Sequence, residues 1–417
     1  MSIPRIPPRD VTLPLLADPY RFVSKESARL GSAAFETRLL CRGTTCLKGE
    51  KGAALFYDAE RFRREGAMPS PIRKTLLGEG GVQGLDGEAH RHRKAIFMGL
   101  TQADRVRALG ARVEAEWIEA AERWLRAGAT IRLYDELATM LTRAVCAWSE
   151  TPLPEADVQL RAGHLRALFD AAGARNPRHF WSRHARRRVD RWLKGVIEDV
   201  REGRHRPAEN TATFALAHAR DPGGTPLAAE VAAVELANIL RPTVATAVYV
   251  VFLAHALHTQ PEAARAATQS LAARDAFIEE IRRFYPFFPS LVATTRRDFV
   301  WEGLSFPEGR QVILDLYGTN HDANAWPDPE IFRPARFANR PPGAFDFVPQ
   351  GGGDHLTGHR CPGEGIVHEI LMRSFDVLTT RLRYEVPKQD LRLNLRRLPA
   401  LPRSGFFLRP LDLARSG

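Results

Sequence analysis

The stretch FDFVPQGGGDHLTGHRCPGEGIVHEILMRSFDVL, Phe345 to Leu378, carries the strongest structural signal in this sequence. The glycines at 351 to 353 allow the backbone to approach a flat or bulky group closely, and the loop then delivers Cys361. The residues after Cys361 have a helical pattern, which places Cys361 at a helix N-terminus. There the unpaired N–H groups and the helix dipole favour the thiolate, the form that a metal ligand or a nucleophile requires.

On these grounds alone, three roles are open to Cys361. A nucleophile needs a nearby base, for which His359 and His355 are the candidates. A zinc site needs further cysteine or histidine ligands at short spacing, and only histidines are available. The third possibility is a buried loop cysteine without chemistry.

Length and composition bound the protein class. The chain has 417 residues, a formal net charge of +11 and four cysteines without a CxxC pair, too few to staple a chain of this size. It shows no internal repeat or low-complexity linker, so we expect one unit over residues 1–417. No segment reaches the roughly 18 consecutive apolar residues of a membrane span, and the N-terminus lacks the apolar core of a signal peptide. We therefore expect a cytoplasmic protein without a membrane span.

Much of the positive charge lies in RHFWSRHARRRVDRWLKGVIEDVREGRHR, Arg178 to Arg206. Its apolar residues recur every three or four positions, which predicts an amphipathic helix with its arginines on the solvent face. The residues predicted to face inward are Trp181, Ala185, Val189, Trp192, Val196 and Val200. No nucleic-acid motif accompanies the run, so we expect no nucleic-acid partner.

Helical periodicity dominates the middle of the chain, and strand-like pieces cluster near the N-terminus and in the C-terminal third. The pattern predicts a mainly α fold with a small β region leaning on a large helical one. The expected helices are Ala103–Leu125, Tyr134–Trp148, Glu155–Ala172, the basic run, and several from Pro226 to Tyr285. The expected strands lie in Phe35–Gly43, Ser290–Phe306, Arg310–Gly318, Leu382–Pro387 and Ser404–Pro410.

The segment from Pro226 to His258 has one helical pattern of about 30 residues, which would span roughly 45 Å. Pro242 cannot donate to the helix ladder, so we expect a kink or a freed carbonyl at 239 to 242. Arg241 places a fixed charge in the middle of this apolar helix. A buried guanidinium needs an anionic partner, either Glu235 or Glu280 within the protein or an anion from outside.

The motif FxPxGGGxxxxGHRCPGE, Phe347 to Glu364, resembles the haem-binding loop of the cytochrome P450 superfamily, with Cys361 as the axial thiolate. FIEEIRRFYP and PDPEIFRPARF resemble the superfamily's ExxR helix and the segment that completes its ion-pair cluster. DGEAHRHRK resembles the helix that holds the haem propionates. The resemblance implies the P450 fold, with haem b between a large helical lobe and a small β-rich lobe. It assigns the ion-pair cluster to Glu280, Arg283 and Arg336, and haem binding to Cys361, His90, Lys94, Arg64 and His359.

Two departures narrow the resemblance. The cysteine loop is longer than in most members, and the central helix lacks the acidic residue and threonine that normally serve proton delivery. Arg241 and Pro242 stand there instead, which is the signature of the fatty-acid peroxygenase branch, closest to its α-hydroxylating members. This branch implies hydroxylation of long-chain fatty acids by hydrogen peroxide, mainly at the α-carbon and without a redox partner. Arg241 would hold the substrate carboxylate, which a planar guanidinium suits, and that carboxylate would serve as the acid–base group.

The same resemblance implies further pocket residues. Gln83 matches a position where decarboxylating members tend to carry histidine, and Phe288 is the bulky residue of the α-hydroxylating members. The implied substrate contacts are Arg241, Pro242, Gln83, Leu77, Phe169, Phe287 and Phe288. The alternatives are a β-hydroxylating or decarboxylating peroxygenase, a monooxygenase that depends on a redox partner, and a non-catalytic haem-containing lipid binder.

Overall fold

A computed structural model describes residues 4–170, 177–338 and 340–414. The helices of eight or more residues are α2 (Phe22–Leu30), α3 (Gly49–Phe56), α5 (Gly87–Leu100), α6 (Ala103–Ala127), α7 (Leu133–Ser149), α8 (Val158–Asp170), α9 (Pro177–Arg201), α11 (Ala229–Ala245), α12 (Ala247–Thr259), α14 (Leu271–Phe284) and α16 (Glu364–Asp376). The shorter helices and turns are α1 (Thr12–Ala17), α4 (Ser70–Ile72), η1 (Arg73–Leu77), η2 (Val82–Gly84), η3 (Glu155–Asp157), α10 (Ala212–Ala217), α13 (Pro261–Ala267), α15 (Leu316–Asn320), η4 (Pro334–Phe337) and η5 (Val377–Arg381).

The strands form three sheets. Their bounds are β1 (Arg5–Asp10), β2 (Ala34–Leu39), β3 (Arg42–Leu47), β4 (Phe62–Arg63), β5 (Ile131–Arg132), β6 (Ser290–Thr295), β7 (Phe299–Trp301), β8 (Leu304–Phe306), β9 (Gln311–Asp315), β10 (Leu382–Glu385) and β11 (Phe407–Leu413). The largest sheet has the order β1-β2-β3-β9-β6-β4, so strands from the N-terminus and from the C-terminal third share one sheet. Cys46 on β3 lies beside Ile313 on β9 in parallel, and Val292 on β6 lies opposite Ile313 in antiparallel register.

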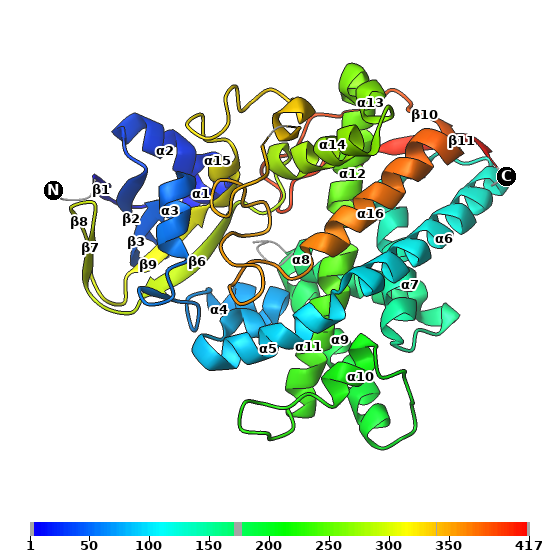
Figure 1. The fold of residues 1–417 in the computed structure, drawn as a ribbon, viewed down its shortest axis with the longest axis horizontal. Helices are drawn as coiled ribbons and strands as arrows, with labels where there is room; N and C mark the ends of the chain where they lie inside the picture. The colour runs from blue at the N-terminus through cyan, green and yellow to red at the C-terminus, as the bar shows by residue number, and fades with distance from the viewer. Residues whose placement is uncertain (1–3, 171–176, 339, 415–417) are drawn as a thin grey trace.

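Figure 1 shows the large sheet and the N-terminal helices at one end of the molecule and the long helices at the other. The mainly α fold with a small β region is therefore confirmed. The expected strands and long helices are present, but the sequence did not predict α1, α2 or α3. The helix expected at Glu155–Ala172 begins with the turn η3 and continues as α8; Ala171 and Ala172 lie outside the described residues. The single unit over residues 1–417 stays a prediction.

The central helical segment runs from Ala229 to Thr259 and is long and apolar enough to cross a membrane, with a mean hydropathy of 1.6 over its most apolar window. In the protein it is a core element, because 94% of that window is buried inside the structure. It packs against α7, α8 and α9, among others. A cytoplasmic location stays a prediction.

The helix is interrupted at Thr246 rather than at Pro242. α11 continues through Pro242 to Ala245, and α12 begins at Ala247. The helix assignment is thus unbroken at 239 to 242, where a kink or a freed carbonyl was expected, and Pro242 within it has no N–H to donate. The amide of Thr246 donates to the carbonyl of Thr243 at 3.1 Å, a tighter i to i−3 turn, and the helix resumes one residue later.

The basic helix α9 differs from its predicted pattern at two positions. Ala185, Val189, Val196 and Val200 are buried as expected, but Trp181 is 51% exposed. Arg186 is only 3% exposed, although every arginine of this helix was expected on the solvent face. Arg186 is buried because α9 packs against neighbouring elements on more than one side, including η1 and α11. Part of its polar face is therefore covered as well.

Candidate active site

Cys361 lies in the loop just before α16, as the sequence predicted. Its amide donates to the carbonyl of Gln350 at 3.2 Å, and the Gln350 side-chain amide lies 3.7 Å from its sulfur. Burial raises the pKa of the Cys361 thiol, and the nearby Glu364 raises it further. The backbone N–H of Gly363 lowers this pKa, as expected of a helix N-terminus, but burial raises it more.

Neither alternative chemistry for Cys361 gains support from the geometry. The Nε2 atom of His355 lies 3.1 Å from the carbonyl oxygen of Cys361 and thus hydrogen-bonds the backbone there. Within the described ranges, no group of three or more His, Cys, Asp or Glu side chains is arranged to hold a metal ion, which leaves the zinc alternative without a ligand set.

The glycine-rich loop is close-packed against other parts of the protein. Gly351 has φ +96°, and a Cβ there would lie 2.8 Å from the hydroxyl of Tyr57. A Cβ on Gly352 would lie 2.6 Å from the carbonyl of Ala344. Tyr57 and the segment near Ala344 therefore lie too close to the loop for side chains at positions 351 and 352. This explains why glycine is needed there.

A charged network ties the cysteine loop to α14. Arg360 donates from Nε to Oε1 of Glu364 at 2.8 Å, and Arg282 donates from Nη2 to the other oxygen at 3.1 Å. None of these three residues was predicted from the sequence as a site residue. The signal was an arginine directly before Cys361 and a glutamate three residues after it, one helical turn apart.

Four side chains predicted to bind the haem propionates lie together near Cys361, the cations Arg64 and Lys94 and two histidines whose pKa burial lowers. The rings of His90 and His359 stack with centroids 3.8 Å apart, and Nζ of Lys94 donates to the carbonyl of Arg360. Nη1 of Arg64 is buried and has no hydrogen-bond partner among the described residues. Burial lowers the pKa of Arg64 to about 10 and that of Lys94 to about 8. The buried positive charges of Arg64 and Lys94 lie beside a cysteine thiol. This arrangement fits a group that carries two carboxylates and an iron that binds a thiolate.

The predicted ion-pair cluster is centred on two fully buried groups, Glu280 and Arg283. Arg283 donates to both oxygens of Glu280, from Nε at 2.7 Å and from Nη2 at 2.8 Å. Nε of Arg336 lies 3.2 Å from the same carboxylate, and Nη1 of Arg283 donates to the carbonyl of Asn320. The cluster thus connects α14 to the segment before the cysteine loop.

Arg241 is 6% exposed and has no carboxylate partner among the described residues. Its Nη2 donates to Oδ1 of Asn238 at 3.1 Å, while its Nε is buried without a partner in the described structure. Both carboxylates that the sequence offered are occupied, Glu235 by Arg93 at 2.6 Å and Glu280 by its own cluster. Burial, together with the charge of Arg186, lowers the pKa of Arg241 to about 9.

The remaining predicted pocket residues differ in how they relate to Arg241. Gln83 is joined to Arg241 through Asn238, whose Nδ2 donates to the Gln83 side-chain oxygen at 3.2 Å. Phe287 and Phe288 contact each other edge to face, with centroids 4.7 Å apart. Phe169 belongs to the apolar core of the helical lobe and Leu77 packs against that core; among the described residues, neither is joined to Arg241 by a hydrogen bond or ring contact.

Comparison with known proteins places this geometry in a family. The sequence profile of the cytochrome P450 family matches residues 254–397. A solved structure of cytochrome P450SP alpha (CYP152B1) in complex with (R)-ibuprofen is 57% identical, covers 96% of this chain and 98% of its own, and has a TM-score of 0.95. The chain belongs to the cytochrome P450 family. This P450 also resembles cytochrome P450EX alpha (CYP152N1) with myristic acid, at 40% identity, 100% coverage of both chains and a TM-score of 0.96.

A structure of a cytochrome P450 OleT variant with arachidonic acid is 31% identical to this P450, with 100% coverage of both chains and a TM-score of 0.95. Among curated relatives, cytochrome P450 4A10 of Mus musculus is 33% identical over 137 residues, 31% of this chain. The match spans about a quarter of that relative, 25% of its length. The resemblance that the sequence predicted is thus confirmed, and with it a haem-thiolate oxidoreductase with a cysteine-ligated haem b.

Proposed function

We propose that this P450 is a peroxygenase that uses hydrogen peroxide to hydroxylate long-chain fatty acids, mainly at the α-carbon. The observation that carries the proposal is Arg241, a buried guanidinium without a carboxylate partner among the described residues. A buried charge is costly unless it is paired, so the site is completed by an anion from outside the chain. Two of the similar structures contain fatty acids, which are anions of this kind.

Asn238 prepares Arg241 for such an anion. By accepting from Nη2, it fixes the orientation of the guanidinium and leaves Nε without a partner among the described residues, available to donate to a carboxylate. Asn238 in turn donates to Glu235 at 3.0 Å and to Gln83, so its own position is determined by α11 and by the segment at η2. Arg241 therefore binds the substrate as a pre-oriented donor.

Cys361 would ligate the haem iron, and Arg64, His90, Lys94 and His359 would hold its propionates. When bound, the haem supplies activation of hydrogen peroxide, with one oxygen atom inserted into a C–H bond and the other released as water. The carboxylate held by Arg241 provides the acid–base group that proton transfer from and to peroxide needs, a role for which α11 offers no acidic side chain beside Arg241. An electron-transfer partner is then unnecessary.

The preference for the α-carbon rests on how the carboxylate and the chain are held. Anchoring the carboxylate at Arg241 places the adjacent carbons at the reacting centre. Phe287 packs against Tyr249, with centroids 4.4 Å apart, and Phe288 packs against Phe287, so rings held in this way would limit how far a bound acyl chain can shift. Gln83, an amide rather than an imidazole, favours hydroxylation over decarboxylation.

The test is product analysis by mass spectrometry after haem-loaded protein is mixed with myristate and hydrogen peroxide without a reductase. We expect 2-hydroxymyristate. A 3-hydroxy acid or a terminal alkene would keep the peroxide chemistry and overturn the α-assignment. Turnover only after NADPH and redox proteins are added would refute the peroxygenase proposal.

A further inference from the structure

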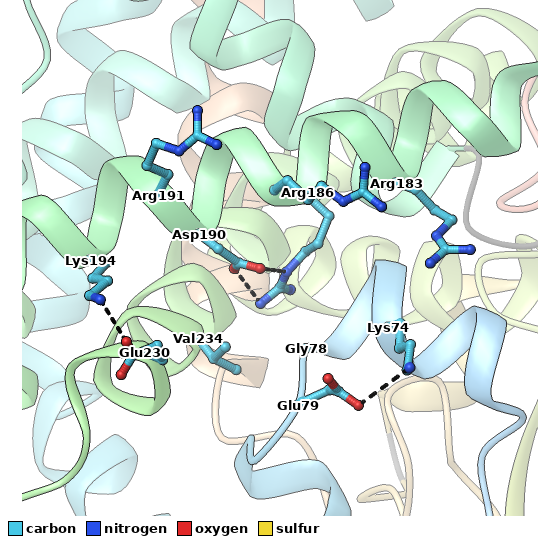
Figure 2. A pocket seen from close by; sticks show the side chains of 11 residues that line it. Lys74, Gly78, Glu79, Arg183, Arg186, Asp190, Arg191, Lys194, Glu230 and Val234 are labelled. Carbon is cyan, nitrogen blue, oxygen red and sulfur yellow. Dashed lines mark hydrogen bonds and ion pairs between the residues drawn. The ribbon is translucent and has the colours of Figure 1, made fainter.

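A strongly basic pocket of 610 Å³ opens between α9, the segment around Gly78 and the first turns of α11 (Figure 2). Six cationic and three acidic side chains line it. The cations are Lys74, Arg183, Arg186, Arg187, Arg191 and Lys194, and the carboxylates are Glu79, Asp190 and Glu230. Among the residues that the structure describes, Arg183, Arg187 and Arg191 form no ion pair, so the pocket keeps an excess of positive charge.

Arg186 is the innermost of these cations. Its Nε donates to Asp190 at 2.9 Å, and its Nη2 lies 2.7 Å from the other oxygen of that carboxylate. Nη1 is buried without a hydrogen-bond partner in the described part of the chain, and Nη2 faces Asp190 as an ion pair without hydrogen-bond geometry. Arg186 thus presents a buried donor that an anion in the pocket would satisfy.

Gly78 lets Arg186 reach this position. Gly78 has φ +85°, and a Cβ there would overlap the Arg186 guanidinium and lie 2.7 Å from Cγ1 of Val234. Figure 2 shows the Arg186 side chain directed from α9 toward Gly78 and Val234. The guanidinium therefore lies at the inner end of the pocket, against α11.

The inner end of the pocket and the proposed substrate site lie on the same helix. Val234 and Arg241 are seven residues apart on α11, which is about two turns and roughly 10.5 Å along the same face. Asn238 lies between them and hydrogen-bonds Arg241. The charge of Arg186 contributes to lowering the pKa of Arg241, which agrees with the two guanidinium groups lying along one face of α11.

We propose that this pocket captures the carboxylate of the incoming fatty acid and that Arg186 is its last contact before Arg241. The proposal rests on the proposed function, because it names the route to the same carboxylate site. The unpaired cations at the pocket raise the local concentration of anionic substrate, and the unpaired Nη1 of Arg186 provides a binding point inside the protein. Asp190 keeps Arg186 oriented while no substrate is bound.

The experiment follows the fatty-acid-induced shift of the haem absorption band by stopped flow, with myristate as the probe. We expect Arg186→Gln to slow the association rate constant about tenfold and to raise KM with an unchanged kcat, while Arg186→Lys retains most of the rate. The wild-type rate should fall steeply with ionic strength, and the rate of Arg186→Gln less steeply. The matched control is Arg188→Gln, which removes the same charge from an exposed position of α9 that does not line the pocket.

An association rate for Arg186→Gln equal to that of the wild type and the control would overturn the capture role. A fall in kcat without a change in association rate would overturn it as well and would make Arg186 part of the chemistry. If Arg186→Gln does not fold, the exposed pair Arg187→Gln and Arg191→Gln replaces it, with an expected threefold slowing; an unchanged rate contradicts the proposal. A wild-type protein without a myristate-induced shift or peroxide turnover refutes the proposed function itself.

Discussion

Arg93 on α5 and Glu235 on α11 form a buried ion pair, with 2.6 Å between Nη1 and Oε1. Their side chains are 8% and 0% exposed. Glu235 lies less than two turns before Arg241 on the same helix and would otherwise be the nearest carboxylate in sequence for that guanidinium. Because Arg93 occupies it, the positive charge of Arg241 remains available to a ligand.

Arg93→Gln should lower the free energy of unfolding by about 3–5 kcal/mol, because it leaves the buried Glu235 without its cation. The double variant Arg93→Gln/Glu235→Gln should recover a large part of that loss. Urea denaturation of the haem-loaded proteins measures both. If the effects of the two single changes simply add in the double variant, the pair contributes no coupling energy.

Arg241→Ala should abolish fatty-acid hydroxylation, since it removes both the binding point and the orientation of the acid–base group. A short carboxylic acid added as a decoy should support oxidation of a non-acid substrate less well in Arg241→Ala than in the wild type. The reason is that the variant lacks the anchor for the decoy's carboxylate as well. Peroxide-driven product formation is measured for each combination. Full fatty-acid activity of Arg241→Ala would disprove the carboxylate role.

Cys361→Ser should lose the absorption spectrum typical of a thiolate-ligated ferrous–carbon monoxide complex. The hydroxyl keeps the size of the side chain but removes the sulfur ligand. A parallel Cys146→Ser variant, at a buried cysteine of α7 away from the loop, should keep the spectrum. An unchanged spectrum of Cys361→Ser would move the iron ligand to another residue.

Phe288→Ala should increase the share of 3-hydroxy product relative to 2-hydroxy product. The large ring contacts Phe287, and its removal gives the substrate chain room to shift by about one carbon. Chromatography of the products from one fatty acid gives the ratio. Leu271→Ala, an exposed residue at the start of α14, serves as a control that should not alter it.

Asp315 should make the protein less stable as the pH rises. Burial raises the pKa of this carboxyl from 3.8 to about 6, against hydrogen bonds from Gly318 and Ser24 that lower it. Between pH 4 and 6 the unfolded chain therefore releases this proton more readily than the folded chain, and above pH 6 the folded state carries an unfavourable charge.

Asp315→Asn keeps an acceptor for the Gly318 N–H and removes that charge. It should stabilise the protein at pH 8 relative to the wild type by up to about 3 kcal/mol, and by less at pH 5. Chemical denaturation of both proteins at the two pH values gives the difference. A gain that is the same at both pH values would show that ionisation of Asp315 is not its source.

The sequence predicted those parts of the fold and site whose signals are local. The long periodic helix expected from Ala103 to Leu125 appears as α6, and the glycine-rich motif placed Cys361 before α16. The short helices α1 to α3 escaped prediction because few of their residues follow a long apolar period, and α1 has no buried residue. Their positions depend on packing against the sheet.

The contacts that long-range packing determines were missed for the same reason. Nothing within the arginine run 178 to 206 marks Arg186 as the one that turns inward, because its space is provided by Gly78, far away in the sequence. Arg93 likewise follows two similar residues, Arg91 and His92, and only the position of α11 shows which of them meets Glu235. The helix N-terminus at Cys361 could be predicted because it is local, whereas the burial that raises the pKa of this thiol could not.

The position of Arg241 also matters while the chain is still being synthesised. The segment Ala229–Thr259 meets the length and hydropathy of a bilayer-spanning helix, and before it packs it would be exposed to the machinery that inserts such helices. A guanidinium near the centre of an inserting helix costs about 2.5–3.5 kcal/mol, while each leucine or valine contributes only a fraction of that. The side chain that we assign to the substrate therefore also opposes mistargeting of the nascent helix to a membrane.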